Sequence, residues 1–379
     1  MNIKSLLLGS AAALVAVSGA RAADAVVVAE PEPVEYVRIC DVYGAGFYYI
    51  PGTETCLKVG GYLRHDIRAG RGGYGGLNKV LDKMGDGEHD TYYQRSRAAL
   101  QLDARSETEL GTLRGYMHIN FNYDTAAPDR ITTTSTGVAI NHAFIELGGF
   151  RVGKTDSLFA TLPGYAGAVL EDDLIPYAGA GYETHQIAYT FKGDNGFSAA
   201  VAVEEGSGKV LVDQFWNGAK FVDVKAEGAI DSYVPHVAAG AAYTQAWGGI
   251  SGVVGYDSVW EEWTGKARLD VNASDSVSLF VMAGYGSDKN ALRNFYKGWG
   301  GNWAIWGGGT VKLNKQTSFN AQVSYAENKD VAVVANVAYS IVPGFKITPE
   351  IAWTSFHSDI TKEKIRSGFG GMVRFQRSF

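Results

Sequence analysis

The sequence predicts an all-β fold: a 16-stranded antiparallel transmembrane β-barrel with a long third loop folded into the lumen. Three observations lead to this prediction. Apolar and polar residues alternate along most of the chain, as in strands that separate an apolar phase from a polar one. Beyond the N-terminal segment, no apolar run approaches the roughly 18 residues that a membrane helix needs. Tight turns alternate with longer connections, as at the two rims of outer-membrane barrels.

The first 22 residues have the features of an export signal. Lys4 gives a positive start, residues 6–17 form an apolar core, and Ala20-Arg21-Ala22 forms a small-residue cleavage site. We therefore expect residues 1–22 to be a cleaved signal peptide; an uncleaved anchor helix is the alternative. Residues 23–54 are expected to form a periplasmic leader and a cysteine hairpin, and residues 55–379 the barrel.

Cys40 and Cys56 are the two cysteines of the chain. The segment between them contains turn residues at Gly44, at Gly46 and at Pro51-Gly52. In an oxidising compartment a disulfide closing this hairpin is the expected state. A two-cysteine metal site is disfavoured because no histidine pair accompanies the cysteines.

The alternating runs define sixteen strands, an even number that allows the sheet to close. Closure is required because lipid cannot satisfy the hydrogen bonds of an exposed strand edge. The strands are expected at residues 55–71, 90–105, 112–125, 138–147, 150–154, 183–191, 197–204, 233–246, 250–256, 265–272, 277–285, 299–313, 317–326, 331–340, 346–356 and 368–379. Aromatic residues near the strand ends fit interfacial girdles: Tyr123, Phe191, Tyr285, Tyr325, Tyr339 and Trp353.

The connection at residues 155–182 is long, and it is the segment most suited to shape the channel. It is rich in glycine and alanine and contains Pro163 and Pro176. It also carries three consecutive acids, Glu171, Asp172 and Asp173. A loop of this length between regular strands is usually functional. We expect it to fold into the bore, so that its acids set the width and charge of the narrowest point.

Basic residues recur on the polar face of the first three strands, with Asp66 and Asp103 between them. They are Lys58, Arg64, Arg68, Arg95, Arg97, Arg105 and Arg114. In a soluble protein such a face would simply be solvated. In a barrel, each arginine facing lipid near mid-membrane would cost roughly 2–4 kcal/mol, so these residues are expected to line the lumen. The acidic loop opposite this wall predicts a weak preference for cations.

Other motifs do not favour further chemistry. Residues 148–155, GGFRVGKT, formally match a phosphate-binding loop, but they alternate like a strand and no amphipathic helix follows. The seven histidines (His65, His89, His118, His142, His185, His236 and His357) have no ligand spacing, so no metal site is expected. His118 and His142 lie on neighbouring strands near serine and aspartate, a combination that arises by chance. No catalytic residue, cofactor or nucleic-acid partner is expected.

Residues 40–64 (CDVYGAGFYYIPGTETCLKVGGYLR), the segment FRVGKTDSLF and the terminal Phe379 resemble the alphaproteobacterial general porins, the family of the major outer-membrane porin of Brucella. The resemblance covers the whole mature chain. It implies passive diffusion of ions and small hydrophilic solutes through a trimer in the bacterial outer membrane. Glycines near the closing strands would permit close packing between protomers: Gly60, Gly61, Gly368, Gly370 and Gly371.

The resemblance also implies contact with outer-membrane lipid and lipopolysaccharide. Phe379, with Val373 and Phe375 on the same face, resembles the signal that barrel proteins present to the assembly machinery, although Arg377 departs from it. The alternative is a substrate-specific sugar or anion channel of the same architecture. Such a channel would show a path of lumen aromatics, whereas Tyr62, Tyr93 and Tyr116 stand among arginines. An adhesin or a passenger translocator is disfavoured because only the leader and the hairpin precede the barrel.

Overall fold

The computed structural model describes residues 38–379, apart from 71–78, 82–83, 86, 127–132, 168, 180–181, 207–209, 217–220, 228–229, 231 and 358–363. The expected signal peptide and leader lie outside the described residues. Met1–Arg38 and Ile39–Phe379 are separate units, and every described strand belongs to the second. In the described part of the chain, no helix is long and apolar enough to cross a membrane.

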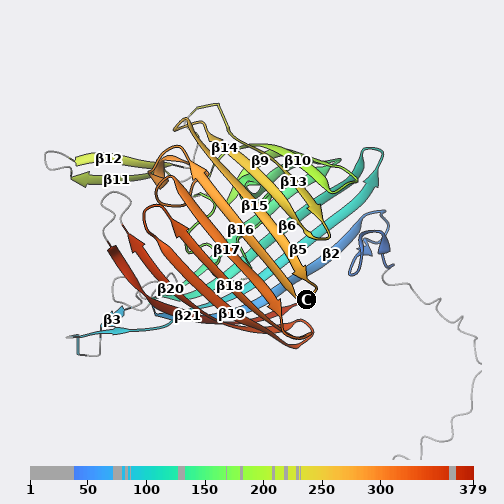
Figure 1. Ribbon diagram of the computed structural model, residues 1–379. Helices are drawn as coiled ribbons and strands as arrows, with labels where there is room; N and C mark the ends of the chain where they lie inside the picture. The colour runs from blue at the N-terminus through green and yellow to red at the C-terminus, as the bar shows by residue number, and fades with distance from the viewer. Residues whose placement is uncertain are drawn as a thin grey trace, which may run out of the picture. The chain divides into compact units, whose positions relative to one another are not determined.

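Sixteen strands form one closed antiparallel barrel, as predicted (Figure 1). Closure is visible at β2 (Cys56–Gly70), which pairs with β5 (Tyr93–Thr108) on one edge and with β21 (Lys364–Ser378) on the other. The remaining strands are β6 (Gly111–Ala126), β7 (Thr133–Leu147), β8 (Phe150–Asp156), β9 (Glu183–Lys192), β10 (Phe197–Glu204), β13 (His236–Gln245), β14 (Gly248–Asp257), β15 (Glu262–Ser274), β16 (Val277–Gly286), β17 (Trp303–Lys312), β18 (Thr317–Ala326), β19 (Val331–Val342) and β20 (Phe345–His357).

The described loops contain a few smaller elements. Two separate hairpins pair β3 (Lys79–Leu81) with β4 (Glu88–Asp90) and β11 (Val210–Trp216) with β12 (Phe221–Glu227). Neither hairpin was expected from the sequence. The short helices are η1 (Asp41–Tyr43), α2 (Leu158–Thr161) and η3 (Ala291–Arg293).

One strand is longer than predicted: the sequence predicts a strand at residues 138–147, whereas β7 begins at Thr133. The same strand contains a bulge: His118 pairs with His142, whereas Ile119 pairs with Ile140. Asn141 is therefore an extra residue without an opposite partner. Consecutive strand residues normally face opposite sides, so the bulge lets Asn141 and His142 both face the lumen.

The two faces of the wall have the expected polarity. On β9, Ile187 and Tyr189 are exposed on the outer face, while Gln186 and Ala188 are buried on the inner face. Several of the expected girdle aromatics are also exposed, namely Tyr123, Phe191, Tyr285 and Tyr339. The outer face is therefore suited to lipid, and the inner face carries the polar groups of the channel.

The cysteine hairpin closes as expected, since Cys40 and Cys56 form a disulfide. The strand β1 (Tyr48–Tyr49) pairs with the start of β2, and Phe47 is buried beside both cysteines. The hairpin also contacts lumen cations: Lys58 Nζ donates to the Ala45 carbonyl at 3.2 Å, and the Arg105 guanidinium lies 5.1 Å from the centre of the Phe47 ring.

Candidate functional site

The long loop leaves the wall through a buried polar anchor at its first turn. Ser157 caps α2 by accepting the amide of Phe159, and its hydroxyl donates to Glu204 at 2.7 Å. The amide of Leu158 donates to the other oxygen of the same carboxylate at 2.8 Å. Glu204 lies at the end of β10 and is buried. Because a buried carboxylate needs such donors, this contact fixes the direction in which the loop leaves β8.

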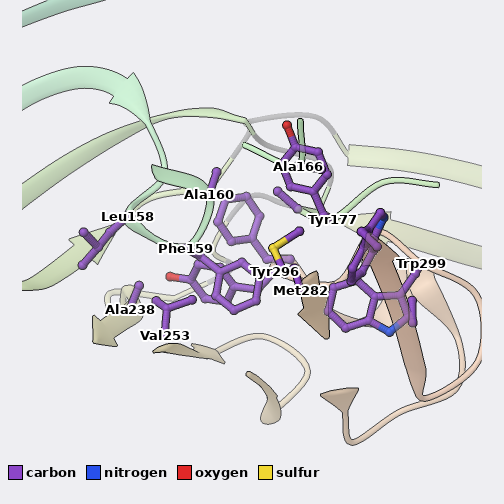
Figure 2. Packing of buried hydrophobic residues seen from close by; sticks show 14 of the residues in the cluster. Leu158, Phe159, Ala160, Ala166, Tyr177, Ala238, Val253, Met282, Tyr296 and Trp299 are labelled. Carbon is purple, nitrogen blue, oxygen red and sulfur yellow. The ribbon is translucent and has the colours of Figure 1, made fainter. Parts of the chain in front are cut away.

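The underside of the loop is apolar and packs against one side of the bore. Figure 2 shows Phe159 and Tyr177 of the loop among Tyr296, Met282 and Trp299, with Ala238 and Val253 from the wall. Two wall side chains hold the backbone of the loop: Lys266 Nζ donates to the Tyr177 carbonyl and Trp306 Nε1 to the Ile175 carbonyl, both at 2.8 Å. The loop is thus fixed to the wall formed by β10 and β13–β17.

The acidic part of the loop reaches further around the wall. Glu350 on β20 accepts the backbone amides of Leu170 and Glu171, the latter at 3.0 Å. Gln322 on β18 donates to the Asp172 carbonyl at 2.7 Å. Arg68 on β2 forms an ion pair with Glu171, with Nη2 and Oε1 3.0 Å apart. The loop therefore begins at β8 and contacts three strands that are distant from β8 in the barrel, namely β18, β20 and β2.

Two of the loop acids have pKa values shifted into the neutral range. Burial raises the pKa of Glu171 to about 7, although the charge of Arg68 opposes the shift. Burial, together with the neighbouring charge of Asp173, raises the pKa of Asp172 to about 7. Burial likewise raises the pKa of Asp173. Since removing a carboxylate from water disfavours its ionised form, the charge of this segment depends on pH near neutrality.

Of the seven predicted basic residues, Arg68 is the one that contacts the acidic segment. Two others bond to neutral amides: Arg64 Nε donates to Gln376 Oε1 at 3.0 Å, and Arg97 Nε donates to Asn122 Oδ1 at 2.7 Å. They lie on the same wall, since Arg64 and Arg97 are directly opposed on β2 and β5. Arg374 on β21 was not predicted as part of this wall; its Nε lies 2.7 Å from Asp66 Oδ1.

The other four basic residues do not contact the acidic segment. Arg95 pairs with Asp124 at 2.6 Å, and Lys58 contacts the hairpin. Arg105 and Arg114 share Asp103 near the rim of tight turns, at 2.7 and 3.0 Å. Arg114 also pairs with Glu146, which Arg151 shares. Asp103 was noted in the sequence, but Asp124 and Glu146 were not, because strand pairing brings them to the arginines from β6 and β7.

The remaining motifs have structural roles. The segment GGFRVGKT forms a turn and the strand β8, and its Lys154 bonds to the Ile140 carbonyl at 2.7 Å and to Glu183. The following helix α2 has four residues, too few to form the phosphate-binding arrangement of the motif. In the described ranges, no three His, Cys, Asp or Glu side chains are grouped to hold a metal.

Comparison with known proteins agrees with this architecture. The family model described as "Porin subfamily" matches residues 24–370. The chain is 46% identical to Porin Omp2a of Brucella melitensis biotype 1 and 47% identical to Porin Omp2b of Brucella suis, each over 100% of both chains.

Solved structures share the fold at low identity. The outer membrane channel DcaP of Acinetobacter baumannii is 16% identical with a TM-score of 0.62, covering 87% of this chain and 99% of that one. A mutant porin of Rh. blastica is 13% identical with a TM-score of 0.56, covering 85% of this chain and 100% of that one. The chain belongs to the porin subfamily and is a diffusion channel of the bacterial outer membrane.

Proposed function

We propose that the segment around Glu171, Asp172 and Asp173 forms the constriction of this channel, opposite a basic wall. The observation that carries the proposal is the ion pair between Arg68 and Glu171, which joins the loop to β2. Arg64 and Arg97 extend the wall below this pair, and neither donates to a carboxylate through its Nε. Permeating ions then pass beside this pair, near the other loop acids on one side and Arg64 and Arg97 on the other, and such fixed charges tune selectivity by attracting counter-ions.

The channel is proposed to be a general one for ions and small hydrophilic solutes. The tyrosines that could guide a sugar carry guanidinium groups over their rings. Arg64 lies 4.5 Å from the ring centre of Tyr62, and Arg114 lies 4.8 Å from that of Tyr116. Rings covered in this way do not offer a continuous apolar path for sugar, which disfavours the substrate-specific alternative.

Single-channel conductance with a graded series of uncharged sugars tests this proposal. A general channel shows a size cut-off, so that small sugars reduce the current only through solution conductivity. Block that saturates with the concentration of one sugar would instead indicate a substrate-specific channel. Charged solutes of matched size then report the effect of the constriction charges.

The protein is further proposed to form a homotrimer through the outer face of β2 and β5–β7. This face carries polar groups: Gln94 and Ser96 are exposed, and His65 Nδ1 lies 3.0 Å from Ser96 Oγ. The same face also exposes apolar residues such as Leu63 and Phe121, so it combines polar and apolar groups, whereas the exposed residues of β14–β16 include Val254 and Val281. Polar groups in hydrocarbon are costly, so another protomer is a better neighbour for the first face and lipid for the second. Of the predicted glycines, Gly61 and Gly371 lie on the outer face, as their alternation with the inward residues of their strands requires.

The remaining proposals concern the membrane and the chain ends. Lipid and lipopolysaccharide are proposed to contact the apolar face of β13–β20. Phe379 pairs through its backbone with Gly61 at 3.1 Å in both directions, while its side chain is exposed. We therefore retain it as the group recognised by the barrel assembly machinery. Residues 1–22 remain a proposed signal peptide and residues 23–54 a proposed periplasmic leader and hairpin.

A further inference from the structure

We propose that His118 and His142 form a binding site on the lumen wall for a divalent transition-metal ion such as Ni²⁺ or Zn²⁺. The two residues are directly opposed on the neighbouring strands β6 and β7. Their ring centres lie 5.5 Å apart with an angle of 35° between the ring planes. Both side chains are half-buried on the inner face, where solutes pass.

The separation of the rings fits a chelate. Metal–nitrogen bonds are about 2.0–2.1 Å, and a ring nitrogen lies about 1.1 Å from the ring centre, so two imidazoles on one tetrahedral metal have centres about 5.2 Å apart. The observed 5.5 Å requires only a small adjustment. Imidazole is a preferred ligand of zinc, copper and nickel, whereas magnesium and calcium prefer oxygen.

The hydrogen bonds of the two rings also suit metal binding. His118 Nε2 lies 3.1 Å from Asn120 Oδ1, and His142 Nδ1 lies 3.0 Å from Thr155 Oγ1. An amide oxygen can only accept, so Nε2 of His118 carries the proton and Nδ1 keeps its lone pair. Metal-bound histidines usually have their second nitrogen held by a neighbouring oxygen, which fixes the tautomer and the ring orientation.

The bulge in β7 creates this arrangement. Along β7, the alternation of inward and outward residues shifts by one position at the extra residue Asn141. Ala139 faces inward on one side of it and His142 on the other, so that His142 lies opposite His118. Asn141 itself accepts a hydrogen bond from Asn120, which supports the His118 side of the pair. Such bulges commonly redirect side chains near functional sites. With no third ligand grouped here among the described residues, water would complete the coordination.

A bound ion adds two positive charges to the wall below Arg97. Its functional effect is therefore a shift of ion preference toward anions, reversed by a chelator. This effect is independent of the acidic loop, so failure of the metal site leaves the proposed constriction unaffected.

Calorimetric titration of the tag-free, detergent-solubilised protein with NiCl₂ tests the proposal. We expect one ion per chain for the wild type. His118→Ala and His142→Ala should each weaken binding by at least about tenfold, since even outer-shell changes cost roughly 10–100-fold in metal affinity. His185→Ala is the matched control, because His185 is exposed on the outer face of β9, away from the lumen and from the proposed subunit contact, and it should bind like the wild type. MgCl₂ should give no binding that depends on these histidines.

His142→Gln is the second variant, since its amide keeps a polar group beside Thr155 without an imidazole. Heat-modified gel mobility verifies that each variant has folded. The proposal is overturned if the wild type binds no Ni²⁺ at millimolar concentration, or if the substitutions at the two histidines leave the affinity unchanged. It is also overturned if only one of the two positions affects binding, because a chelate requires both.

Discussion

Arg68 on β2 and Glu171 on the long loop form an ion pair that joins the two sides of the proposed constriction, with 3.0 Å between Nη2 and Oε1. The side chains are 14% and 15% exposed, so solvent screens the pair less than it would a surface pair. If the proposed constriction is correct, the acid contributes to the field along the permeation path; the ion pair itself joins the loop to β2.

Neutralising the three loop acids should move the ion preference toward anions. The variant Glu171→Gln, Asp172→Asn, Asp173→Asn removes the negative side of the constriction and leaves Arg64, Arg68 and Arg97. Zero-current potentials in a salt gradient measure the change, most clearly at low salt, where the Debye length exceeds ~10 Å. Glu261→Gln, an exposed loop acid, is the control. An unchanged potential in a folded triple variant would show that the acids do not line the path.

The ion preference should depend on pH in the neutral range. Burial raises the pKa of Glu171 and of Asp172 to about 7, so both are ionised above that pH and protonated below it. We expect a weak cation preference at about one unit above pH 7 that is lost at about one unit below. The triple variant should show no such change between these two values. A wild-type potential that is flat across this interval would contradict the expectation.

The same acids link folding stability to pH. Their folded pKa values lie above the ordinary values of 4.5 for glutamate and 3.8 for aspartate, so the folded protein binds more protons than the unfolded chain. Stability from these two groups is therefore full at acidic pH and falls as pH rises to about 7. Denaturant midpoints of the wild type and the triple variant should converge on acidification. A constant difference between them would exclude the linkage.

Glu350→Ala should release the acidic segment from the wall. The carboxylate accepts the amides of Leu170 and Glu171, and each buried donor left without a partner costs about 1–3 kcal/mol. We expect noisier single-channel current and faster proteolysis within the loop, while the barrel remains folded. Glu350→Gln keeps an acceptor oxygen and should behave closer to the wild type. Equal noise in all three proteins would mean that Glu350 does not hold the loop.

Removing the disulfide should affect the hairpin and spare the barrel. A cross-link with a sequence separation of 16 restrains a short loop, worth on the order of 3 kcal/mol. In Cys40→Ser, Cys56→Ser we expect faster proteolysis before residue 56 and an unchanged heat-modified mobility. Thiol labelling of denatured, unreduced wild type should find no free cysteine; two labelled thiols per chain would refute the pairing in the cell.

A bulky residue on the outer face of β2 and β5–β7 should dissociate the proposed trimer. Ser96→Trp places a large ring beside His65, where we propose contact with a second protomer. Val281→Trp places the same ring on the apolar face of β16, where lipid can accommodate it. Native mass spectrometry should find monomers for the first variant and trimers for the second. Trimers in both cases would move the interface elsewhere.

The barrel could be predicted from sequence because strand alternation and connection lengths are local properties. Its charge pairing could not, because it depends on register: Arg95 pairs with Asp124 and Arg374 with Asp66 only after β5, β6, β2 and β21 align. Likewise, Glu350 is far from Leu170 along the chain, and no local pattern marks it as an anchor. The bulge at Asn141 was also missed, since one inserted residue leaves the apolar content of β7 unchanged.

Tyr296 and Trp299 lie in the connection between β16 and β17, yet they pack directly against the apolar underside of the long loop. Connections between strands generally tolerate more sequence variation than the strands that they join. Here a substitution that alters these two rings would also remove packing from Phe159 and Tyr177 and disturb the proposed constriction. Evolutionary drift in this connection is therefore restricted at its buried rings, because a change there alters the channel as well as the connection.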